Sequence, residues 1–123
     1  MRNVIYLLLL ALLTGLTLTA VAGEGAAGSW NGEIVDVACY VANGDQGRGP
    51  DHAKCAKGCV KGGQPMGLLI DDGTLYILAA DHKDGAPYEA AKDLAGEMAE
   101  VSGVASENAG VKMVTVTGVK KAG

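Results

Sequence analysis

The sequence predicts a small all-β domain with two short helices, in which five strands form a Greek-key barrel. Two pairs of apolar runs are each joined by a short turn rich in Asp, Asn and Gly, a pattern typical of β-hairpins. One further run of β-forming residues precedes both pairs. Two segments that begin at a proline and end at a glycine predict helices between these runs.

The chain begins with a segment typical of a secretory signal peptide. Arg2 supplies a positive charge, and the apolar run 4–22 carries no charged residue and ends in small residues before Gly23. This pattern favours removal of residues 1–22 during export. A retained membrane anchor is the alternative, because about 20 apolar residues are enough to span a bilayer. We therefore expect a periplasmic or secreted protein, bound to a membrane only if this segment is retained.

The first half of the mature chain predicts one strand and one helix. Residues 23–29 are small and are expected to form a flexible tether. Residues 30–41 are rich in β-formers and predict a strand, followed by a glycine-rich loop at 42–49. A helix is expected to begin at Pro50 and to stop at Gly62-Gly63.

The second half predicts two hairpins separated by a helix. Residues 66–70 and 75–79 are apolar runs joined by an Asp-Gly turn. Residues 87–95 begin with proline, end before glycine, and predict a helix. Residues 98–105 and 111–119 alternate between apolar and polar and predict the second hairpin.

This order of elements is that of the OB-fold, a small and partly open Greek-key barrel. We expect five antiparallel strands, with a helix inserted between the first two strands and another between the third and fourth. Residues 30–123 are long enough for one such domain, although its core is small.

Several short motifs accompany this order. A Cys-Tyr pair closes the first strand, a Gly-rich loop and a His-x-x-Cys-x-x-x-Cys helix follow, and Gly-Leu-Leu and Leu-Tyr-x-Leu strands come next. They are Cys39-Tyr40, His52 with Cys55 and Cys59, Gly67-Leu68-Leu69 and Leu75-Tyr76-Ile77-Leu78. With them the chain resembles small secreted bacterial OB-fold proteins of uncharacterised function. The resemblance covers nearly all of the mature chain and implies no particular activity.

The strongest functional signal is a cluster of metal-ligating residue types. All three cysteines and one of the two histidines lie between positions 39 and 59: Cys39, His52, Cys55 and Cys59. On a helix the last three would share one face within about 60°. Three thiolates and an imidazole form a standard ligand set for structural zinc, and thiolates also suit cuprous copper. Met66 and His82 are additional candidate ligands.

The cysteines also allow a different interpretation. A disulfide from Cys39 to Cys55 or Cys59 would close a loop of 17 or 21 residues, worth roughly 3 kcal/mol. The chain would then be a disulfide-stabilised module that binds a protein or peptide partner. A thiol-redox enzyme is a third interpretation. The disulfide leaves one thiol and His52 without a role, whereas a metal uses all four residues.

Composition argues against several other functions. Without Arg2 the chain keeps nine basic side chains against fourteen acidic ones, a charge that repels nucleic acid. The Cys-x-x-Cys-His motif of c-type haem attachment is absent. No hydrolase or transferase motif is present, so we do not expect an enzyme.

Overall fold

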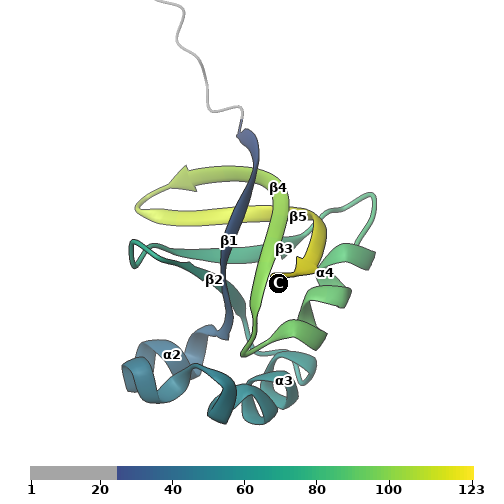
Figure 1. The fold of residues 1–123 in the computed structure, drawn as a ribbon. Helices are drawn as coiled ribbons and strands as arrows, with labels where there is room; N and C mark the ends of the chain where they lie inside the picture. Colours follow the sequence, from purple (N-terminus) through teal and green to yellow (C-terminus); the bar gives the residue numbers. More distant parts are fainter. Residues whose placement is uncertain (1–24) are drawn as a thin grey trace, which may run out of the picture.

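The computed structural model describes residues 25–123, in which five strands close into a barrel in the order β1-β2-β3-β5-β4 (Figure 1). The strands are β1 (Ala26–Asp36), β2 (Met66–Ile70), β3 (Leu75–Ala80), β4 (Met98–Asn108) and β5 (Val111–Lys121). The α-helices are α2 (Val37–Asn43), α3 (Ala53–Lys61) and α4 (Ala86–Ala91). Single 3-10 turns are η1 (Gly44–Gly47), η2 (Pro50–His52) and η3 (Lys92–Leu94).

The predicted fold class is confirmed, because a five-stranded barrel carries a Cys/His-bearing helix between its first two strands. Two details differ from the prediction. A third α-helix, α2, is present, and β3 pairs with β5 in parallel rather than antiparallel. The parallel pairing is accessible because α4 and β4 lie between these strands and provide the long connection that it needs.

The first strand begins earlier than expected. Ala26 pairs with Ala105 of β4, and the ladder continues through Ser29, which pairs with Ser102. Residues 26–29 therefore belong to the barrel instead of a tether. The predicted signal peptide, residues 1–22, lies outside the described residues. Within residues 25–123 no helix has the length and apolar character needed to cross a membrane.

The first strand also ends earlier than expected, and this changes where Cys39 lies. The strand was predicted to reach Val41, but it stops at Asp36 and α2 follows. The Asp36 side chain caps this helix, since Oδ1 accepts hydrogen bonds from the N–H groups of Ala38 at 2.9 Å and Cys39 at 3.4 Å. Val37 and Val41 are β-branched and favour a strand, but the Asp36 cap and the packing of this segment in the folded chain override that preference. Cys39 consequently lies on a helix.

The barrel interior and the inner face of α3 form one apolar core. Ala56 and Val60, one helical turn apart, are the α3 residues that enter it, and both are 1% exposed. The core consists of Ile34, Ala56, Val60, Met66, Leu68, Leu78, Ala91, Ala95, Ala99, Val101, Val114 and Val116. Burial of this face orients α3, so its cysteines must lie on a different side of the helix.

Candidate metal centre

The four residues selected from the sequence lie where α2, η2 and α3 meet at one end of the barrel. Cys39 is on α2, His52 ends η2, and Cys55 and Cys59 are on α3. The ligand atoms of Cys39, His52 and Cys55 lie within 4.8 Å of one another. The Sγ atoms of Cys55 and Cys59 are 4.0 Å apart, and the Sγ of Cys59 is also within 4.8 Å of that of Cys39.

These separations fit a shared metal ion better than a disulfide. Sulfur atoms that are bound to one tetrahedral zinc at about 2.3 Å lie about 3.8 Å from each other. A disulfide needs a sulfur separation of about 2.05 Å. All three cysteines are free thiols. The disulfide expected as the alternative, from Cys39 to Cys55 or Cys59, is therefore not present.

A fifth residue, Asp36, completes the cluster. A carboxylate oxygen of Asp36 and the sulfurs of Cys39 and Cys59 all lie within 4.8 Å of one another. Asp36 is 1% exposed, and its Oδ2 atom has no well-formed hydrogen bond. Asp36 was not among the ligands predicted from the sequence. One sequence feature could have indicated it: an aspartate lies three positions before Cys39. If a helix begins there, the aspartate caps it and its carboxylate lies next to the first helical turn, which contains Cys39.

His52 also carries a buried atom without a partner. Its Nε2 is shielded from solvent and forms no hydrogen bond with the protein. Buried polar atoms are normally paired, and each exception requires an explanation. A metal ion held with Cys39 and Cys55 would supply the missing partner for this nitrogen.

Asp36 and partial burial keep two of the thiols protonated. The pKa of Cys39 is raised to about 11, first because the nearby Asp36 carboxylate favours the protonated thiol as a donor, and then because of desolvation. The pKa of Cys59 is also raised, by contact with Asp36 and then with the thiol of Cys55. A bound metal reverses this preference, because it removes the proton from a coordinating thiol.

The glycine-rich loop folds back to bring η2 and α3 toward α2. A Cβ atom on Gly47 would overlap the carbonyl of Cys39, so only glycine permits this close approach. The buried carboxylate of Glu33 holds the next part of the loop. It accepts a hydrogen bond from the N–H of Gly49 and pairs with Arg48 at 3.4 Å. These contacts position the chain just before His52.

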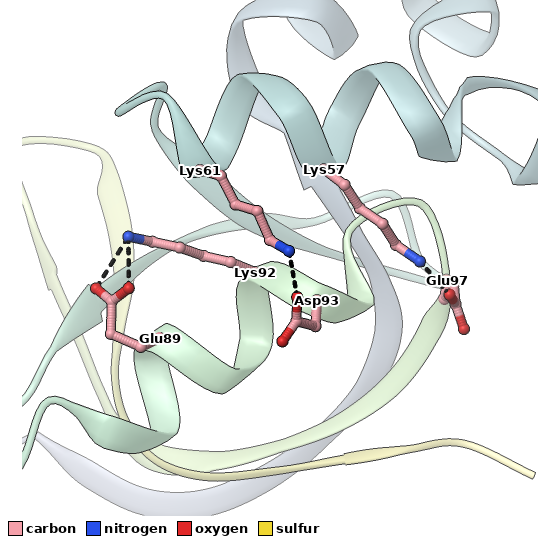
Figure 2. Close-up of polar contacts among 6 residues, drawn as sticks. All are labelled: Lys57, Lys61, Glu89, Lys92, Asp93 and Glu97. Atoms are coloured by element: carbon pink, nitrogen blue, oxygen red, sulfur yellow. Dashed lines mark hydrogen bonds and ion pairs between the residues drawn. The ribbon is translucent and has the colours of Figure 1, made fainter.

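Ion pairs hold the face of α3 that lies opposite its cysteines (Figure 2). Lys57 contacts Glu97 at 2.5 Å and Lys61 contacts Asp93 at 2.5 Å, where the chain passes from η3 into β4. Lys121 also pairs with Glu97 at 2.5 Å. At helical spacing Lys57 and Lys61 lie on the face of α3 opposite Cys55 and Cys59. Partly exposed pairs add little stability each, but they fix the rotation of the helix.

The two additional candidate ligands occupy different surroundings. Met66 begins β2 opposite Asp36 in the ladder and is fully buried in the apolar core. His82 is exposed between β3 and α4, and it belongs to neither group of converging ligand atoms.

A surface groove of about 640 Å³ lies beside η2. Its charged lining residues are already paired with one another: Glu33 and Asp45 with Arg48, and Glu97 with Lys121. No unpaired charged group of this lining is left to select a ligand. The groove therefore does not distinguish one class of partner from another.

Comparisons of the chain with protein-family models, with curated proteins and with solved structures find no match. Because a fold alone does not define a function, the chemistry of the cluster has to carry the functional conclusion.

Proposed function

We propose that this chain is an exported metal-binding protein without catalytic activity, in which Cys39, His52, Cys55 and Cys59 hold zinc or cuprous copper. One observation carries the proposal: three free thiols and an imidazole on α2, η2 and α3 lie in two overlapping groups that share Cys39, and the buried Nε2 of His52 has no hydrogen-bond partner. Residues 39 to 59 leave the barrel and return to it around this cluster, so a metal would also tie two helices together.

The ligand types restrict the metal. Thiolates select zinc, cuprous copper or iron–sulfur clusters over magnesium and calcium, which prefer oxygen ligands. Iron–sulfur clusters usually require four cysteines, and this chain has three. An imidazole beside three thiolates is a common zinc set, and the same thiolates would hold cuprous copper.

The two alternative functions have less support. A thiol-redox enzyme needs a thiolate with a lowered pKa, whereas the pKa of Cys39 is raised to about 11. A disulfide-stabilised peptide-binding module would need a disulfide, and all three cysteines are free. Such a module could use the groove beside η2, but the paired charges there favour no partner.

Histidine substitutions provide a matched test. His52→Ala should lower zinc or copper retention after dialysis by at least about tenfold, because a direct ligand matters at least as much as an outer-shell partner. His82→Ala replaces the exposed histidine and should leave retention unchanged. Equal retention by both variants and the unaltered protein would exclude His52 as a ligand, and absence of bound metal from all three would refute the proposal.

A further inference from the structure

The cluster contains more ligand groups than one metal ion needs. Two sets of three converge, one formed by Cys39, His52 and Cys55 and the other by Asp36, Cys39 and Cys59. Cys39 belongs to both sets. A tetrahedral ion uses four ligands, so the five groups of the two sets, the shared Cys39 included, exceed the requirement of one ion.

Asp36 is the group that one Cys3His ion does not use. It is 1% exposed, and none of the ion pairs formed within residues 25–123 includes it. Its Oδ1 caps α2, while Oδ2 is buried without a well-formed hydrogen bond. A carboxylate oxygen of Asp36 lies within 4.8 Å of the sulfurs of Cys39 and Cys59. Burying a carboxylate that has no cation beside it and one oxygen without a well-formed hydrogen bond is costly, so a cation in contact with Asp36 would reduce this cost.

The charge of the cluster also indicates that it needs more than one divalent ion. Coordinated thiols lose their protons, so the three cysteines and Asp36 together supply four negative charges, and the histidine ligand is neutral. One divalent ion would leave two of these charges uncompensated beside the apolar core. Two divalent ions would neutralise the cluster completely.

We propose that the cluster holds two divalent metal ions bridged by the Cys39 thiolate. The first ion is bound by Cys39, His52 and Cys55, and the second by Asp36, Cys39 and Cys59. This inference rests on the proposed metal-binding function and adds a second site to it. Cys55 is exposed, so solvent water can reach the cluster and complete the coordination of the ions.

Each ligand then has a distinct expected effect on stoichiometry. Asp36→Asn keeps an oxygen that can cap α2, but it removes the negative charge, so it should abolish the second site only. Cys59→Ser, which removes a ligand carried by α3, should also abolish the second site only. His52→Ala should abolish the first site, whereas Cys39→Ser should weaken both because it removes the bridge. Circular dichroism of each metal-free variant checks that the fold is retained.

Native mass spectrometry of the metal-free protein, titrated with Zn²⁺ under reducing and oxygen-free conditions, provides the test. Two ions per unaltered chain and one ion per Asp36→Asn or Cys59→Ser chain are expected, with His82→Ala retaining two. Saturation of the unaltered chain at one ion would overturn the two-ion site while leaving the proposed function in place. Two ions in both Asp36→Asn and Cys59→Ser would also overturn it, and no bound zinc at all would refute both proposals.

Discussion

Replacement of Val60 by alanine tests whether the barrel core, rather than a cross-link, positions the cysteine-bearing helix. Val60 is 1% exposed and lies in the apolar core. Removing its two methyl groups loses about 1.6 kcal/mol of transfer free energy at about 0.8 kcal/mol for each group. The cavity left behind adds up to about 1 kcal/mol. We therefore expect Val60→Ala to lower the free energy of unfolding by about 1.6–2.6 kcal/mol.

Val41→Ala is the matched control, because Val41 lies on α2 and is 70% exposed. It should change the free energy of unfolding by less than about 0.5 kcal/mol. Urea denaturation of the metal-free, reduced proteins measures both values. The Val60→Ala loss corresponds to a melting temperature lower by about 6–20 °C for a domain of this size. A loss below about 0.5 kcal/mol at Val60, or equal losses at both positions, would show that α3 is not held by the core.

Three further predictions concern the loop, an acidic side chain and the thiols. Gly47→Ala should destabilise the fold by about 1–3 kcal/mol, because its Cβ would overlap the carbonyl of Cys39. Gly58→Ala, in open space on α3, should stabilise the fold by up to about 1 kcal/mol in the same denaturation assay, and the opposite ranking would contradict the geometry. The pKa of Glu97 is lowered from 4.5 to about 2 by hydrogen bonds from Lys121 and Lys57, so its stabilising effect is complete above pH 4.5 and is lost as the pH falls toward 2. An NMR titration midpoint above 4 for this carboxyl would show that the ion pairs do not form in solution. Zinc binding at pH 7 should release at least one proton, because the pKa of Cys39 is about 11 and its thiol must ionise to bind. Calorimetry in two buffers of different ionisation enthalpy measures this release, and an equal heat in both would contradict thiol ligation.

The parts of the fold that follow from local patterns were predictable. The strands at 66–70 and 75–80 agree with their apolar runs, and Gly73 between them has the positive φ of 83° that a tight turn requires. The helix predicted from Pro50 consists of the 3-10 turn η2 and then α3, and it ends as expected, since Gly62 and Gly63 follow α3 directly. In these segments the residues next to each element set its limits.

The parts that depend on tertiary context were not predictable to the same extent. Residues 37–41 favour a strand by composition, but the Asp36 cap and the packing of α2 make them helical. The sequences of β3 and β5 do not indicate that these strands pair in parallel, because the pairing forms only when the barrel closes.

In the candidate site, too, local spacing predicted some residues, whereas another depended on the tertiary fold. The spacing of His52, Cys55 and Cys59 predicts a common helix face, and the structure brings their side chains close to Cys39. Asp36 could not be assigned to the cluster while residues 30–41 were expected to form one strand. Its position became clear only because the chain turns into α2 directly after it.

The most direct test of the metal-binding proposal is the number of metal ions and free thiols in protein purified from an oxidising compartment without added reductant. The proposal predicts bound zinc or copper, no disulfide, and three thiols that react only after the metal is removed. One disulfide, one free thiol and no metal would contradict it.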